Sequence, residues 1–386
     1  MAISLIIYIL TFIISSFACE KYELLADSRK IKGKYSISET DVYKLICIIL
    51  IFVPPILITT FRGIEVGTDN SSYLEIYDYN KTYNLKEYLN VYGTWHHTYE
   101  IGFQQIQWIA YKVHGGYNLV KAICSFIIVF FMWRGALYYH RKFKIDSGFC
   151  VLLFYLMEFS YSLNAVRFSI ALSIFFYAFQ FVIEKRPFMY FFYCFIMVLF
   201  HNAMIIVAVF YLINYIRYNH NKRRFKYTIC FIIVIITVFL RGVINVLLPR
   251  LTSSFSRLDE YEIDTTAEFG LGIYVFLVLF LVPLIRWDSL VKKDVEWTCI
   301  LIVALLYIPF RFLSYFNVWL NRLMRMPELM LCVTYCGLLK LPINRDKRIL
   351  WKIYIVLLVF GNYLYSSMLL KSSEVYPYVF DFSNHL

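Results

Sequence analysis

Hydrophobic runs of roughly 17 to 22 residues recur along most of this chain, the length an α-helix needs to cross a bilayer core. Hydrophobic residues make up 60% of the 386 residues and charged residues only 17%. The pattern predicts an all-α polytopic membrane protein with about twelve transmembrane helices. The expected spans are 2–18, 44–60, 117–139, 147–163, 166–183, 187–200, 202–216, 227–248, 269–285, 297–313, 321–339 and 349–366.

A further apolar stretch, 101–113, is short and carries Gln104, Gln105 and Gln107. Its length and polarity favour a re-entrant or interfacial helix over a crossing one. It belongs to the largest extramembrane insert, 61–116. No linker or soluble domain interrupts the array, so residues 1–386 are expected to form a single membrane domain.

Lysine and arginine recur in alternate loops, which by the positive-inside rule face the cytoplasm. These loops contain the basic residues of 21–44, 141–144, 185–186, 217–226, 286–293 and 340–352. The alternation holds only if 101–113 does not cross, and it places both termini and the insert outside. The net charge of +12 is thus explained by topology, and no nucleic-acid partner is expected.

The stretch 60–73, Thr-Phe-Arg-Gly-Ile-Glu-Val-Gly-Thr-Asp-Asn-Ser-Ser-Tyr, puts charge, glycines and hydroxyls where a span ends. Arg62 offers a planar fork of donors suited to phosphate, while Gly63 and Gly67 permit tight backbone turns. Asp69 is suited to hold a sugar hydroxyl or to take its proton. The alternative is a capped helix end followed by an ordinary turn.

Arginines gather near the outer ends of the spans, where each costs about 2.5 to 3.5 kcal/mol on insertion scales. Bidentate recognition of a diphosphate would explain them, and snorkelling toward the interface is the alternative. The residues are Arg62, Arg167, Arg241, Arg311, Arg322 and Arg325.

Two outer turns carry further candidates. Asn164 and Arg167 flank the turn between the fourth and fifth spans, and His201 lies at the next outer turn. Outer turns can converge on one cavity, where His201 is a candidate base or a structural histidine. Glu158 is an intramembrane carboxylate near the outer end of its span, with Arg167 as a candidate counter-ion. The insert is also rich in tyrosine, which suits either stacking on sugars or an interfacial belt.

The chain resembles the EpsG-like branch of bacterial polysaccharide polymerases, the Wzy-type O-antigen or exopolysaccharide polymerases. Their motif Arg-Gly-x-x-Val-Gly-Thr-Asp-x-x-x-Tyr is matched here by Arg62-Gly63, Val66-Gly67-Thr68-Asp69 and Tyr73. The family's Asn-x-x-Arg-Gln turn is matched at Asn164 and Arg167, with Phe168 in place of the glutamine. The family's histidine near the sixth span corresponds to His201, and its late arginine segment to Arg322 and Arg325.

The resemblance implies a GT-C-like glycosyltransferase architecture in the bacterial inner membrane, with the insert as a periplasmic loop. It implies that a growing glycan on undecaprenyl diphosphate is transferred to a sugar hydroxyl of a second lipid-linked oligosaccharide. A separate chain-length regulator is a candidate partner. No metal or cofactor is expected, because arginines can neutralise the leaving diphosphate. Expected catalytic residues are Asp69, His201 and Glu158. Expected substrate-binding residues are Arg62, Thr68, Tyr73, Asn164, Arg167, Arg311, Arg322 and Arg325.

Two other activities share the lipid-linked substrate. A flippase or transporter would carry charged residues through the whole depth of its bundle, whereas here they concentrate at the outer mouth. An O-antigen ligase shares the donor but uses a lipid A core as acceptor, and only the motif around Asp69 argues against it. Both remain alternatives at this stage.

Overall fold

In a computed structural model, residues 2–32, 39–81, 86–87, 100–215, 286–314, 320–341, 344–371 and 373–383 are described. They form thirteen α-helices, two helices of other types and a single isolated β-bridge within these ranges. The chain divides into two compact units, Met1–Val209 with Val356–Leu386, and Phe210–Ile355. The expectation of one membrane domain stays a prediction.

Among the described residues, five helical segments are long and apolar enough to cross a membrane, so the all-α prediction is confirmed and the chain is a multi-pass membrane protein. They are Ala2–Ala26, Thr40–Thr60, Gly116–Phe143, Val166–Ile183 and Arg345–Leu369. Shorter apolar helices cover Pro187–Phe200, Asn202–Tyr215 and Trp297–Arg311. The number of twelve spans stays a prediction, and the expected spans 227–248 and 269–285 lie outside the described residues.

The first unit contains most of the helices. They are α1 (Ala2–Lys32), α2 (Glu39–Thr60), α3 (Asn70–Asn80), α5 (Ile101–Lys112), α6 (Gly116–Phe143), α7 (Ser147–Asn164), α8 (Val166–Ile183) and α9 (Pro187–Phe200), followed by the 3₁₀ helix η1 (Asn202–Tyr215) as far as Val209. The expected bounds of 166–183 and 187–200 are confirmed. The segment 101–113 forms the twelve-residue helix α5, and its re-entrant or interfacial position stays a prediction. The expected span 202–216 is a 3₁₀ helix.

Local sequence explains several helix ends. The side chain of Asp146 caps α7 by accepting a hydrogen bond from the backbone N–H of Phe149 at 2.9 Å. Pro187 begins α9, where a missing N–H costs nothing. Lys144 adopts φ +58° directly after α6, and this left-handed residue stops the helix.

The second unit contains α12 (Trp287–Lys293), α13 (Trp297–Leu305), α14 (Tyr307–Ser314), α15 (Leu320–Leu338) and the first half of α16 (Arg345–Leu364). The expected span 297–313 is therefore two helices with a break at Leu306. The second half of α16 and the π-helical turn η2 (Tyr365–Leu369) belong to the first unit.

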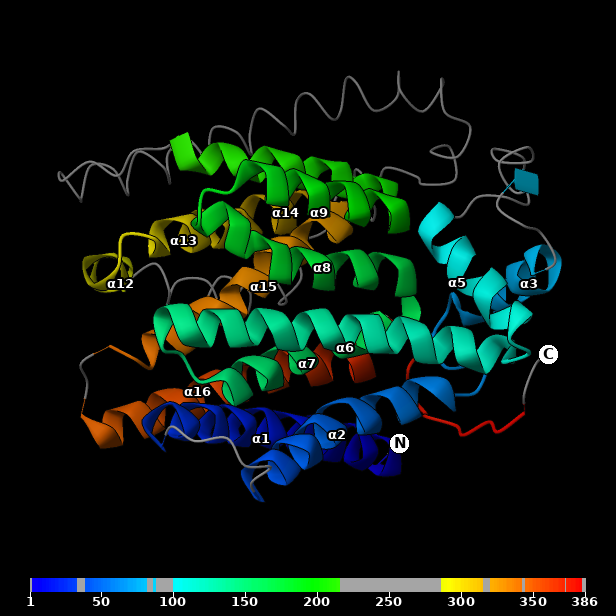
Figure 1. Cartoon of the computed structure of the whole chain (residues 1–386), viewed down its shortest axis with the longest axis horizontal. Coiled ribbons are helices and arrows are strands. Elements are labelled where there is room, and N and C mark those ends of the chain that lie inside the picture. Colours follow the sequence, from blue (N-terminus) through cyan, green and yellow to red (C-terminus); the bar gives the residue numbers. More distant parts are fainter. Residues whose placement is uncertain are drawn as a thin grey trace. The chain divides into compact units, whose positions relative to one another are not determined.

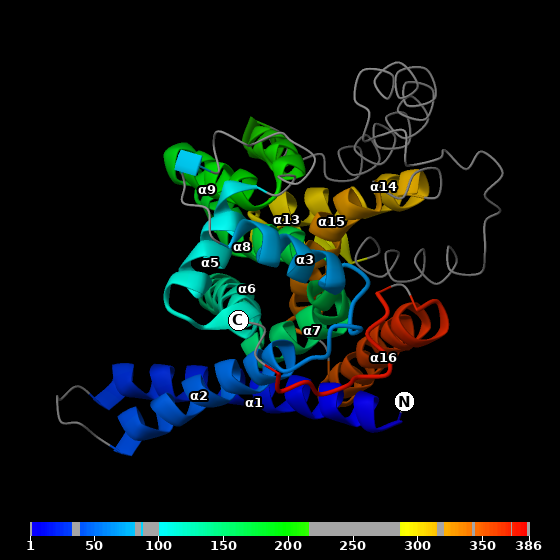
Figure 2. The ribbon, with the colours of Figure 1, turned by 90° about the vertical axis from the view of Figure 1, so that its right-hand side faces the viewer.

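Aromatic packing holds the centre of the first unit together. Phe12 of α1 stacks on Tyr155 of α7 with ring centroids 5.2 Å apart and meets Phe159 edge-on at 5.0 Å. Because α1, α2, α6, α7 and α8 pack side by side and alternate in direction, several of their ends meet at one end of this unit. This end contains the loop that follows α2, the helices α3 and α5, and the turn between α7 and α8 (Figures 1 and 2).

Candidate functional site

The loop that follows α2, residues 61–69, is here called the motif loop. It turns sharply at Gly67, whose φ of +95° belongs to the region that favours glycine. A Cβ atom at Gly67 would lie 2.6 Å from the backbone oxygen of Leu163, so the loop touches the turn after α7. Glycine is needed at this position for both reasons.

Asn70, at the start of α3, holds the motif loop in shape. Its side-chain nitrogen donates to the backbone oxygens of Gly63 and Ile64 at 3.1 and 3.2 Å. Its side-chain oxygen accepts from Arg62 Nη2 at 3.2 Å and from the Tyr117 hydroxyl at 2.9 Å. The buried amide therefore uses both its donor and acceptor capacity within the protein.

Arg62 is completely buried. Its Nη1 donates to the backbone oxygen of Leu163, and its Nη2 donates to Asn70 as described above. Both acceptors are neutral, and Nε has no hydrogen-bond partner among the described residues. Burial lowers the pKa of the guanidinium below its ordinary value of 12.5, and Arg62 remains a cation.

Lys121 of α6 is a second buried cation, which the sequence analysis did not single out. Its Nζ donates to the backbone oxygen of Arg62 at 3.1 Å and lies 5.4 Å from the centre of the Tyr117 ring. Asp381 attracts it electrostatically. A lysine early in a long apolar run costs free energy on insertion, and that signal was present in the sequence.

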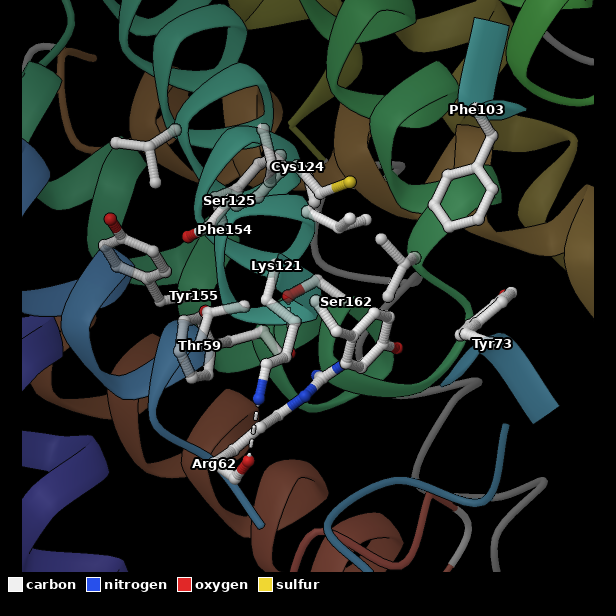
Figure 3. Close-up of a pocket in the computed structure, with 16 residues that line it drawn as sticks. Thr59, Arg62, Tyr73, Phe103, Lys121, Cys124, Ser125, Phe154, Tyr155 and Ser162 are labelled. Carbon is white, nitrogen blue, oxygen red and sulfur yellow. Dashed lines mark hydrogen bonds between the residues drawn. The ribbon is translucent and has the colours of Figure 1, made fainter. Parts of the chain in front are cut away.

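Arg62 and Lys121 border a cavity between α2, α6 and α7, and Figure 3 shows the two side chains close together. Hydroxyl groups of Thr59, Ser125 and Ser162 also line it. The remaining lining is mainly apolar and includes Val129, Phe154 and Phe159. The free space is about 20 Å³, room for roughly one water-sized group.

Asp69 is bound to the turn after α7. Its backbone N–H donates to Asn164 Oδ1 at 2.7 Å. The Asp69 side chain makes no capping bond to α3 and is half-buried, while Thr68 beside it is exposed. The motif loop and the Asn164 turn, which the sequence treats as separate candidates, are therefore in direct contact.

Glu100 connects three of the predicted segments. One of its carboxylate oxygens pairs with Arg167, and the other accepts from the backbone N–H of Asn202 at 3.0 Å. The guanidinium of Arg167 lies over the Tyr73 ring, 5.8 Å from its centre. The sequence offered Arg167 as a candidate counter-ion of Glu158, and in the structure Arg167 forms an ion pair with Glu100.

The imidazole of His201 is buried and packs edge-on against Phe168, with ring centroids 5.1 Å apart. Phe168, which replaces the expected glutamine, thus serves as a packing partner for the histidine. Glu158 is buried inside α7. Tyr73, Asn164, Arg167 and His201 consequently share one end of the first unit with Asp69.

The later arginines belong to the second unit, which is described by itself. Arg325 pairs with Glu328 at 3.1 Å within α15, and Arg311 Nη1 contacts Met324 Sδ at 3.7 Å. Glu328 is buried and attracted by both Arg325 and Arg311. Glu328 was not predicted as a site residue, although it lies three positions after Arg325 on the same helix face. Arg322 lies one turn earlier in α15 and is half-buried.

Within the described ranges, no group of three or more His, Cys, Asp or Glu side chains could hold a metal ion. The described charged groups at the end of the first unit include the ion pair of Glu100 with Arg167 and the buried cations Arg62 and Lys121. Such an arrangement can stabilise negative charge on a ligand and offers carboxylate and imidazole groups for proton transfer.

Comparison with known proteins gives one family. The model of the EpsG family matches residues 45–380. The match includes the motif loop, the turns at Asn164 and His201, and α15. No curated protein and no solved structure matches the chain.

Proposed function

The chain belongs to the EpsG family, which implies a role in polysaccharide biosynthesis, and we propose that it is a polysaccharide polymerase. It transfers a growing glycan from undecaprenyl diphosphate to a sugar hydroxyl of a second lipid-linked oligosaccharide. The reaction takes place on the periplasmic side of the bacterial inner membrane.

The observation that supports this proposal is the convergence of three segments. Asn164 binds the backbone of Asp69, and Glu100 joins Arg167 to the N–H of Asn202, directly after His201. Glycosyl transfer from a diphosphate needs an acceptor for the hydroxyl proton and cations for the leaving group. The carboxylate of Asp69, the imidazole of His201 and the guanidinium of Arg167 lie at this end of the unit.

In the proposed step, the acceptor hydroxyl oxygen attacks the anomeric carbon of the donor sugar. The bond from that carbon to the diphosphate oxygen breaks, and the electron pair leaves with undecaprenyl diphosphate. The hydroxyl proton passes to the carboxylate of Asp69 or the imidazole of His201. Thr68, which is exposed, supplies a hydroxyl group that orients the sugar, and the buried Tyr73 supports Arg167 with its ring.

Arg167 is the cation best situated to contact the diphosphate, because its side chain is 18% exposed whereas Arg62 is buried. Glu100 holds its guanidinium in a fixed direction. Arg62 and Lys121 act through the positive potential that they add from inside the bundle, since their cavity is too small for a diphosphate. The arginines of the second unit, Arg311, Arg322 and Arg325, are proposed to bind lipid-linked glycans.

The test is polymerisation by the purified protein in vesicles supplied with lipid-linked repeat units. We expect a ladder of glycan lengths from the parent and about 10²-fold lower turnover from Asp69→Asn. This substitution retains the backbone N–H that binds Asn164. Asp78→Asn is the matched control, because Asp78 is an exposed carboxylate on α3.

His201→Ala is the paired variant. If it loses turnover while Asp69→Asn does not, the proton acceptor is His201. Translocation of the lipid-linked units without elongation would indicate a flippase. Transfer only to a lipid A core would indicate a ligase. Either of these results would overturn the polymerase assignment.

A further inference from the structure

Residues Ser373–Ser383, here called the clasp segment, pair with the motif loop through the backbone. The N–H of Gly63 donates to Val379 O at 2.8 Å, and the N–H of Gly67 donates to Glu374 O at 3.1 Å. In the other direction, the N–H of Asp381 donates to Phe61 O at 2.8 Å. An antiparallel β-bridge between Arg62 and Phe380 lies within this pairing.

The clasp segment is itself anchored to α1 and α2. The hydroxyl of Tyr8 donates to Val375 O at 3.0 Å, and the hydroxyl of Ser4 accepts from the N–H of Tyr378 at 2.9 Å. The Tyr378 hydroxyl donates to Ile58 O, near the end of α2, at 2.8 Å. Burial raises the pKa of the Tyr378 phenol above its ordinary value of 10.0, so the hydroxyl keeps the proton that it donates.

These contacts satisfy backbone groups that the motif loop leaves without partners of its own. Two N–H groups and one C=O group of the loop bond to the clasp segment. A buried backbone polar group without a partner costs free energy, so the loop conformation depends on this segment. The side chain of Arg62 and the backbone of Asp69 are then directed toward the turn after α7.

We infer that the clasp segment is a positioning element of the transferase site: it fixes the backbone of residues 61–67 so that Asp69 and Arg62 keep their reactive arrangement. The inference rests on the proposed function for its catalytic consequence. The residues of the clasp segment do not contact the reacting atoms in the proposed step. They act by setting the geometry of the loop, and a misplacement of about 1 Å can lower turnover by up to about 10²-fold.

Two substitutions at one position of the full-length protein test the pairing. Asp381→Ala and Asp381→Pro both remove the carboxylate, but only proline also removes the N–H that bonds Phe61 O. We expect Asp381→Pro to lower kcat about tenfold relative to Asp381→Ala, with KM within about twofold, because the loop is misplaced and not the substrate pockets. Amide hydrogen exchange in the peptide 61–69 should be faster in the proline variant.

A second pair of variants tests the anchor without touching the loop or the segment. Tyr8→Phe removes the hydroxyl that bonds Val375 O and retains the ring, whereas Tyr22→Phe changes another tyrosine of the same helix. Tyr8→Phe should reproduce the faster exchange of residues 61–69 and the fall in kcat, and Tyr22→Phe should do neither.

The inference is overturned if Asp381→Pro and Tyr8→Phe keep both the parent kcat and the parent exchange of residues 61–69. A rise in KM with the parent kcat would also contradict a positioning role. The proposed function is judged separately by whether the parent polymerises lipid-linked units. If the parent does not, the exchange measurement still decides whether the clasp segment holds the loop.

Discussion

The side-chain oxygen of Asn164 lies 2.7 Å from the backbone nitrogen of Asp69 and accepts its hydrogen. The two residues are 95 positions apart in the chain. Asp69 belongs to the motif of residues 62–73, and Asn164 belongs to the turn between α7 and α8. Their contact joins the two segments, because the backbone of Asp69 is bound to a residue at the end of another helix.

Replacing Asn164 with alanine should lower polymerisation turnover by about tenfold or more. The Asp69 N–H would lose its acceptor, and the carboxylate would no longer be held in one direction. Turnover in vesicles, normalised to inserted protein, measures the effect. Asn344→Ala is the control, since Asn344 is exposed and remote in sequence from the site. Equal turnover of the two variants would contradict the role given to this contact.

Glu100→Gln should destabilise the protein and impair activity together. The substitution keeps an oxygen for the N–H of Asn202 but leaves the Arg167 guanidinium without its ionic partner, at a cost of about 1 to 3 kcal/mol. Thermal unfolding of the detergent-solubilised protein should detect this loss. The exposed carboxylate of Glu75 on α3 provides the control, Glu75→Gln, which should unfold at the parent temperature.

Gly67→Ala is expected to destabilise the motif loop by more than about 1 kcal/mol, because alanine is strained at φ +95° and its Cβ would collide with Leu163 O. Gly361→Ala is a matched control: a Cβ there meets no atom within 4 Å, and alanine favours a helix over glycine by about 0.5 to 1 kcal/mol. The two variants should shift the unfolding temperature in opposite directions. If Gly67→Ala raised the unfolding temperature as Gly361→Ala does, the loop would tolerate a side chain.

Lys121→Met should separate stability from activity. Removing an ammonium that is buried beside another cation should leave the unfolding temperature unchanged or higher. Turnover should nevertheless fall, because the site loses part of the positive potential that favours diphosphate departure. Lys112→Met, at an exposed position of α5, is the control. A stable Lys121→Met variant with parent turnover would restrict Lys121 to a structural role.

The predicted orientation can be checked with phosphatase fusions. A fusion at Gly93, in the insert expected outside, should be active, and one at Lys222, in a basic loop expected inside, should be inactive. Activity at Lys222 would reverse the topology. Labelling of position 114 from the cytoplasm would show that α5 crosses the membrane.

The sequence was sufficient for the bounds of α8 and α9 and for the meeting of the turns that carry Asp69, Asn164 and His201. Span lengths follow from bilayer thickness, and α8 and α9 begin and end where hydropathy and the preceding turns predict. The convergence of Asp69, Asn164 and His201 on one end follows from the alternation of helix direction. Their chemistry was therefore open to prediction before their distances were known.

The partners of these residues were not predictable in the same way. Glu100 is one acidic residue among several in a polar insert, and nothing in its local sequence links it to Arg167, 67 positions away. The clasp segment binds through backbone N–H and C=O groups, which every residue type except proline provides alike. Such pairing leaves no pattern in the side chains, so only the structure could identify it.

The clasp segment is synthesised long after the motif loop that it holds. Tyr378 and its acceptor Ile58 are separated by 320 positions, and at about 5 to 20 residues per second a ribosome needs on the order of tens of seconds to translate that distance. During this interval the motif loop has already been made, but the backbone groups that fix it have no partners from the clasp segment. Glycan transfer would therefore begin only after the later helices have been synthesised, and a nascent chain would meet its lipid-linked substrates without consuming them.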